Sequence, residues 1–117
     1  MIIAIDFDGT IVEHDYPRIG SLIKNAKDVI NRLHYDGHTI LIWTVRSGIA
    51  QAEAIQYLMD NDIKFDRVNC DAIQVGGNPE WTTFSPKIYA DVYIDDRNLG
   101  GMPEWDEIYK IINNGKV

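Results

Sequence analysis

Two aspartates, Asp6 and Asp8, stand one residue apart after a run of apolar strand-forming residues and directly before Gly9. Two carboxylates this close resist joint ionisation unless a cation or hydrogen bonds compensate for their repulsion. The plain alternative is that they only cap a strand and form a turn. We expect instead that a divalent cation lies between the two aspartates and a substrate phosphate.

Other polar residues also follow apolar runs. Thr44 comes after residues 38–43, and Asp95 and Asp96 come after residues 92–94. If these runs are parallel strands, their carboxyl ends meet at one edge of a sheet, where ligands bind in such folds. The acids would then form one site for a hard cation such as Mg²⁺, which prefers oxygen ligands and often shares them with substrate phosphate.

These residue types suit phosphoryl transfer. An ionised Asp6 can act as a nucleophile, and Asp8 can be the general acid for the leaving group and then the base for water. Thr44 offers a hydroxyl and adjacent turn amides to phosphate oxygens. Lys87 lies just before the last strand and is the candidate to neutralise charge in the transition state.

The chain resembles the haloacid dehalogenase-like hydrolases in four stretches, which occur in the family's order between residues 6 and 96. The stretches are Asp6-Phe7-Asp8-Gly9-Thr10 for the D-x-D-G-T motif, Ile42-Trp43-Thr44 for the second motif, Lys87 for the third, and Ile94-Asp95-Asp96 for the fourth.

The resemblance implies a Mg²⁺-dependent phosphatase that works through an aspartyl-phosphate. It assigns catalysis to Asp6 as nucleophile and Asp8 as acid and base. The other roles that it implies are metal binding by Asp6, the Asp8 carbonyl, Asp95 and Asp96, and phosphate binding by Thr44, Lys87 and the amides of Gly9 and Thr10.

The segments that carry caps in this family are short here. Neither residues 13–20 nor residues 63–86 could hold a full cap domain. A minimal, capless member with an open site is expected. Such members tend to act on large substrates or to borrow a lid from a neighbouring subunit, so a homo-oligomer is possible. The expected substrate is a phosphorylated small molecule or a nucleotide.

Three other functions fit some of these residues. A phosphotransferase could use the same fold, although water reaching an open site favours hydrolysis. A non-catalytic module could keep the Mg²⁺ and phosphate pocket, but it has no need for Asp8 as a second acid. A flavodoxin-like phosphoacceptor domain also gathers acids and a lysine, but there the acid pair and the phosphorylated aspartate come from different strands.

Alternating strands and helices predict an α/β fold, a Rossmann-like three-layer sandwich around a mainly parallel sheet. The 117 residues are expected to form a single domain, 1–117. Strands are predicted at 2–5, 38–43, 65–68 and 92–94, with a weaker candidate at 72–75, and helices from an N-cap at Ser21 to Gly37, at 49–61 and at 104–113.

The composition excludes several classes of protein and of site. A formal net charge of -7 argues against a duplex nucleic-acid surface. Cys70 is the only cysteine, which excludes an intramolecular disulfide and a cysteine zinc site, and it is expected to be a small buried side chain. No stretch is apolar enough to cross a membrane, and no cleavable leader is evident, so a cytoplasmic location is expected.

Several further residues flank the expected site. Arg46 could bind a second phosphate or a nucleotide, or pair with an acid; Arg97 is expected to pair with an acid such as Asp96. Asn98 could orient a metal-bound water. His14 lies in the loop that could cover the site, yet a surface role is the favoured interpretation. Trp81 could stack on a base or pack against the core or an interface.

Overall fold

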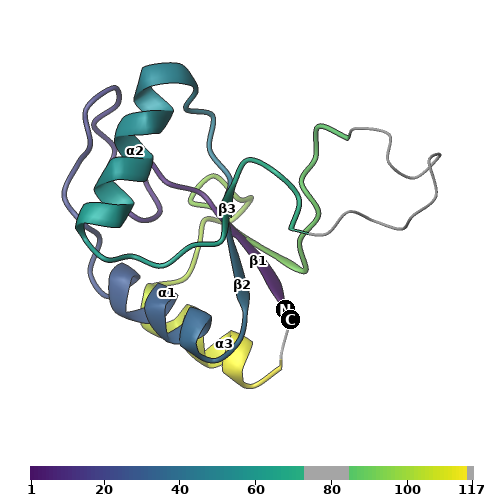
Figure 1. Cartoon of the computed structure of the whole chain (residues 1–117). Coiled ribbons are helices and arrows are strands. Elements are labelled where there is room, and N and C mark those ends of the chain that lie inside the picture. Colours follow the sequence, from purple (N-terminus) through teal and green to yellow (C-terminus); the bar gives the residue numbers. More distant parts are fainter. Residues whose placement is uncertain (73–84, 116–117) are drawn as a thin grey trace.

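The computed structural model describes residues 1–72 and 85–115 and shows an α/β fold built on one parallel sheet (Figure 1). The expected fold class, Rossmann-like with a parallel sheet, is confirmed, and the described residues include no cap domain. The strand order is β3-β2-β1-β4, with β1 at Ile2–Ile5, β2 at Thr39–Ile42, β3 at Arg67–Val68 and β4 at Val92–Ile94.

Strand β1 lies inside the sheet, between β2 and β4. All four of its residues are buried, which is typical of a parallel strand covered on both faces. Ile5 pairs with Ile42 of β2 on one side and with Ile94 of β4 on the other. The chain therefore leaves β1, β2 and β4 at the same edge. Because β2 and β4 lie on opposite sides of β1, this edge carries the switch point at which ligands bind in open α/β sheets.

The described residues form three helices, α1 at Ala26–Tyr35, α2 at Gly48–Asp60 and α3 at Trp105–Asn113, and all three contribute to one hydrophobic cluster. The connections from β1 to β2 and from β2 to β3 run in the same direction across the sheet. Right-handed crossovers then place α1 and α2 on the same face, where Ile30 and Leu58 join Ile3 in the core. The opposite face carries a second cluster around Leu41 and Ile88.

Trp105 fixes the start of α3 beneath the turn that follows β1. Its side chain is 1% exposed, and its indole Nε1 donates a hydrogen bond of 2.9 Å to the carbonyl of Thr10. An indole N–H needs such a partner when the ring is buried. The last helix thus supports the backbone of the first turn, the segment that carries the candidate site.

The first helix begins later than the sequence predicts, and the expected N-cap at Ser21 is wrong. The Ser21 carbonyl accepts a hydrogen bond from the amide of Glu13, and Leu22 forms an antiparallel bridge with Val12. This local pairing satisfies the backbone in an extended form, so that α1 begins only at Ala26. The expected stop at Gly37 is confirmed, since its φ is 98° and its amide closes the helix end on His34.

The predicted bounds of β1 and β4 are confirmed, and the other boundaries agree to within two residues, the largest difference being the start of β3 at Arg67 in place of residue 65. The predicted burial of Cys70 is wrong, because this cysteine is exposed. The weaker strand candidate at 72–75 falls almost entirely outside the described residues. In the part of the chain that is described, no helix is long and apolar enough to cross a membrane.

Candidate active site

Three carboxylates meet at the carboxyl ends of the adjacent strands β1 and β4. Asp6 follows β1, and Asp95 and Asp96 follow β4. One oxygen from each lies within 4.8 Å of the others, so the three could act together as ligands of one cation. We call Asp6, Asp95 and Asp96 the acid cluster. The sequence predicted this convergence from strand ends alone.

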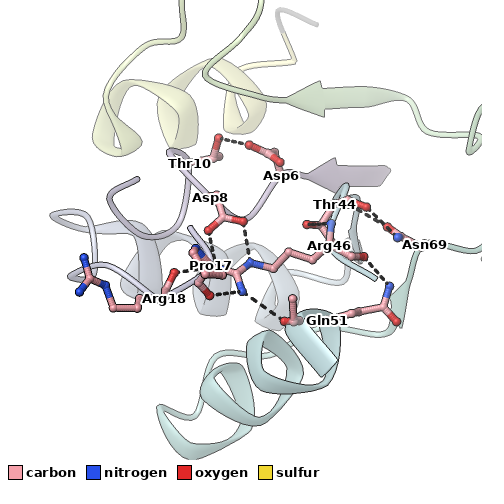
Figure 2. A network of polar contacts seen from close by, with 10 residues as sticks. Asp6, Asp8, Thr10, Pro17, Arg18, Thr44, Arg46, Gln51 and Asn69 are labelled. Carbon is pink, nitrogen blue, oxygen red and sulfur yellow. Dashed lines mark hydrogen bonds and ion pairs between the residues drawn. The ribbon is translucent and has the colours of Figure 1, made fainter. Parts of the chain in front are cut away.

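Thr10 joins two members of the acid cluster. Its side chain is fully buried, and its hydroxyl lies 3.0 Å from Asp6 Oδ2 (Figure 2) and 3.2 Å from Asp96 Oδ1. The same hydroxyl oxygen accepts a hydrogen bond from the amide of Asp96 at 3.1 Å. The hydrogen bond from the Trp105 indole to the Thr10 carbonyl holds the backbone of Thr10 in place. Thr10 therefore sets the spacing of Asp6 and Asp96 through its hydroxyl.

His14 also reaches the acid cluster. Its Nε2 atom lies 2.8 Å from Asp96 Oδ2, which places the loop 13–20 against the site. The sequence favoured a surface role for His14, and its side chain is indeed half exposed. The only sequence signal for this contact was the position of His14 in the loop that follows the first motif.

The electrostatics of the acid cluster suit a cation. Burial, the neighbouring charge of Asp95 and a hydrogen bond shared with Asp96 raise the pKa of Asp6 to about 7. Burial also acts to raise the pKa of Asp96, but hydrogen bonds with His14, Asp6 and Thr10 outweigh it and hold that pKa below its ordinary value. Without a cation, Asp6 thus stays protonated at pH values well above those at which an aspartate normally ionises. A bound cation would favour its ionised form.

We expect the metal-free protein to lose stability as pH rises from about 4 to about 7. Over this interval the unfolded chain has ionised Asp6 while the folded chain still holds its proton, so the folded state binds more protons and its stability falls. Asp6→Asn removes this term. Relative to wild type, Asp6→Asn should raise the free energy of unfolding more at pH 8 than at pH 4, by about 2 kcal/mol after allowance for solvent screening.

Urea unfolding in EDTA at both pH values measures this difference. Asp60→Asn, at the exposed end of α2, is the matched control and should show no such change. An Asp6→Asn effect that is the same at pH 4 and pH 8 would contradict the assignment.

Asp8 points away from the acid cluster. Its side chain is 11% exposed, and its two oxygens accept hydrogen bonds of 2.7 Å each from the Nε and Nη2 atoms of Arg46 (Figure 2). No donor among the described residues bonds to the Asp8 carbonyl, so this oxygen is free to be a ligand. The side chain that the sequence proposed as acid and base is therefore bound by an arginine in this structure.

Thr44 follows β2 with its backbone clamped by a residue that sequence reasoning missed. Asn69 accepts a hydrogen bond from the Thr44 amide at 2.8 Å and donates one to the Thr44 carbonyl at 2.7 Å. The Thr44 hydroxyl accepts from the backbone amide of Arg46 at 3.1 Å, and no acceptor in the described part of the chain takes its own proton. A motif search does not find Asn69, because it only holds a backbone in place.

The remaining predicted phosphate contacts lie elsewhere. The Gly9 amide donates to the Val12 carbonyl at 2.7 Å, and the Thr10 amide donates to the Phe7 carbonyl at 3.3 Å, so both close the turn. The Lys87 amine lies 5.3 Å from the centroid of the Tyr93 ring and forms no ion pair within the described residues.

The flanking residues differ in their outcomes. The Arg97 side chain pairs with no acid in residues 1–72 and 85–115, against the expected pairing with Asp96; its amide instead donates to Asp95 at 2.8 Å. The backbone amide of Asn98 donates a hydrogen bond to the Asp95 carbonyl at 3.3 Å. The contact of the Asn98 side chain with a metal-bound water stays a prediction. Trp81 lies outside the described residues.

Gly9 is required where the loop meets the acid cluster. Its φ is 84°, and a Cβ atom there would overlap His14 Nε2 and lie 2.5 Å from Asp96 Oδ2. Gly9→Ala should therefore cost more than the ~1–2 kcal/mol of left-handed strain and displace His14. Gly37→Ala is the control, since Gly37 has a φ of 98° but nothing within 4 Å of its Cβ position. Urea unfolding compares the two, and equal losses would contradict a close contact at Gly9.

One solved structure has the same fold and a related sequence. It is described as the structure of a conserved protein from Bacteroides thetaiotaomicron, with 43% sequence identity and a TM-score of 0.88. The match covers 100% of this chain and 93% of the other. This chain belongs to the family of that conserved protein.

No protein-family model matches the chain, and no curated protein matches it. The family membership therefore supports the fold, while the chemistry has to be argued from the site itself.

Proposed function

We propose that this protein is a Mg²⁺-dependent phosphatase of phosphate monoesters that works through an aspartyl-phosphate on Asp6. The observation that carries the proposal is the convergence of Asp6, Asp95 and Asp96 at the carboxyl ends of β1 and β4. The order of the four stretches that resemble the haloacid dehalogenase-like hydrolases supports the same activity.

The donor set of the acid cluster fits Mg²⁺. It offers carboxylate oxygens from Asp6 and Asp95 and a supporting carboxylate from Asp96. The resemblance adds the Asp8 carbonyl, which accepts no hydrogen bond from the described residues. Mg²⁺ usually takes one or two carboxylates and leaves its other positions to water and substrate phosphate. When bound, it would neutralise phosphate charge and keep Asp6 ionised at neutral pH.

In the proposed reaction, a carboxylate oxygen of Asp6 attacks phosphorus as the bond to the leaving oxygen breaks. Thr10 holds the Asp6 carboxylate by its hydroxyl, and the Thr44 hydroxyl would donate its proton to a phosphate oxygen. Asp8 gives its proton to the leaving oxygen and then takes one from a water that attacks the phosphorus, which breaks the bond to Asp6 and releases phosphate. For this it must turn from Arg46 toward the phosphate. The role of Lys87 at the phosphate stays a prediction.

The first test is phosphate release by the purified protein from a panel of sugar phosphates, nucleotides and para-nitrophenyl phosphate. We expect release with Mg²⁺ and none in EDTA. The substrate is expected to be a phosphorylated small molecule or a nucleotide, and a cytoplasmic location and self-association stay predictions.

A non-catalytic Mg²⁺ and phosphate-binding module is the second candidate. The observation that favours it is the bidentate pair between Asp8 and Arg46, which occupies both oxygens of the proposed acid. Such a module would bind a phosphorylated ligand in a Mg²⁺-dependent way, measurable by calorimetry, and would release no phosphate from any member of the panel.

A further inference from the structure

Arg46 is an arginine with every donor used. Its side chain is 0% exposed. Nε and one Nη2 proton go to Asp8, and the second Nη2 proton goes to the carbonyl of Arg18 at 2.8 Å. Nη1 donates to the carbonyls of Pro17 at 3.1 Å and Ala50 at 3.2 Å. A guanidinium has five N–H donors, and all five have protein acceptors here.

Two aromatic rings fix the orientation of the guanidinium plane, in addition to the hydrogen bonds of its donors. Its central carbon lies 5.4 Å from the centroid of the Phe7 ring and 5.0 Å from that of Tyr16. Arginine stacks on aromatic rings while it forms bidentate pairs, and lysine can do neither in the same geometry. Arg46 therefore has one fixed position between the turn after β1, the loop 13–20 and the first turn of α2 (Figure 2).

The loop 13–20 is held in place by contacts on two sides of the candidate site. At one side His14 contacts Asp96 of the acid cluster. At the other, the carbonyls of Pro17 and Arg18 are held by Arg46, which also holds Asp8. A ligand that bridges Asp6 and Asp8 would thus lie next to a loop whose position Arg46 sets.

We propose that Arg46 is a positioning residue that fastens the loop 13–20 beside the acid cluster and fixes the resting position of Asp8, from which the Asp8 carboxyl turns toward the phosphate. The catalytic part of this inference rests on the proposed phosphatase function; the fastening of the loop does not. Arg46 does not touch substrate, because its side chain is enclosed. Its loss should therefore lower kcat more than it raises KM.

Arg46→Lys tests the proposal, since it keeps a positive charge beside Asp8 but has three N–H donors in place of five, too few for Asp8, Ala50 and both carbonyls of the loop. Trypsin reports on the loop: the Arg18 side chain is 81% exposed, while its carbonyl is bound. We expect cleavage after Arg18 to be at least ~10-fold faster in the variant, because its backbone can then adapt to the protease. Arg32→Lys, in an exposed pair with Asp36, is the matched control and should leave this cleavage unchanged.

Steady-state phosphate release with Mg²⁺ gives the second readout. In Arg46→Lys we expect kcat to fall by at least ~10-fold, since small misplacements of reacting groups cost up to ~100-fold, with a smaller change in KM. Unchanged cleavage after Arg18 would overturn the fastening. Faster cleavage with an unchanged kcat would overturn the role of Arg46 in catalysis.

The two proposals fail in different ways. Wild-type protein that releases no phosphate defeats the proposed function, while the cleavage rates still decide whether Arg46 fastens the loop. If Arg46→Lys does not fold, hydrogen exchange of the wild-type side chain decides. A slowly exchanging Arg46 Nε–H signal in the ¹H–¹⁵N spectrum is expected from its enclosed bond to Asp8, and rapid exchange would overturn the proposal.

Discussion

Asp6→Asn should lower Mg²⁺-dependent phosphate release by at least ~1,000-fold and leave the fold intact. The amide is a far poorer nucleophile than the carboxylate it replaces, and it carries no charge for a cation. Its size is the same, so the Thr10 hydroxyl keeps an acceptor at the position of Asp6 Oδ2. The fold should survive for a second reason, since the substitution removes a carboxyl that the folded state does not favour in its ionised form.

The measurement is steady-state phosphate release with the best substrate of the panel, together with circular dichroism of the variant. Asp60→Asn, far from the acid cluster on the exposed end of α2, should keep full activity. Activity of Asp6→Asn above a few percent of wild type would exclude Asp6 as the nucleophile. Trapping of a phosphorylated wild-type protein in acid, absent from the variant, would identify the intermediate directly.

The sequence predicts the acid cluster well because it depends on strand ends. Short apolar runs mark β1 and β4, and a parallel sheet brings the residues after them to one edge. Asp6, Asp95 and Asp96 could therefore be placed together without any knowledge of side-chain contacts. The same logic places Thr44 at the end of β2, beside β1.

The direction of the Asp8 side chain could not be predicted in this way. It is set by Arg46, which is separated from Asp8 by 38 residues and whose other partners are backbone carbonyls with no sequence signature. Asn69 escaped notice and the contact of His14 with Asp96 was not predicted for a similar reason, because both side chains act through hydrogen bonds to residues far along the chain. The Ser21 cap was wrong because backbone pairing of residues 21–23 with residues 11–13 outweighed the capping preference of a single residue.

Asp8→Ala should have the largest effect on stability among the site variants. It leaves the charge of Arg46 buried without a counter-ion, and breaking a buried ion pair from one side typically costs about 3–5 kcal/mol. In a chain of this size that corresponds to a fall in Tm of roughly 10–20 °C. Asp66→Ala, which removes an exposed contact to His34 along with a backbone acceptor for Ile40, serves as a comparison and should cost less.

A double-mutant cycle that combines Asp8→Ala with Arg46→Met tests whether Arg46 serves only as the counter-ion of Asp8 or also holds the backbone around it. If Arg46 only neutralised Asp8, replacing both by apolar residues would be close to neutral, as it is for some buried pairs. Here the double variant also removes the three partly buried hydrogen bonds from Arg46 to the carbonyls of Pro17, Arg18 and Ala50, and a typical hydrogen bond contributes about 0.5–1.5 kcal/mol. Urea unfolding should therefore find Asp8→Ala/Arg46→Met still destabilised by at least ~2 kcal/mol. A double variant as stable as wild type would show that Arg46 serves Asp8 alone and that the loop 13–20 holds its position without it.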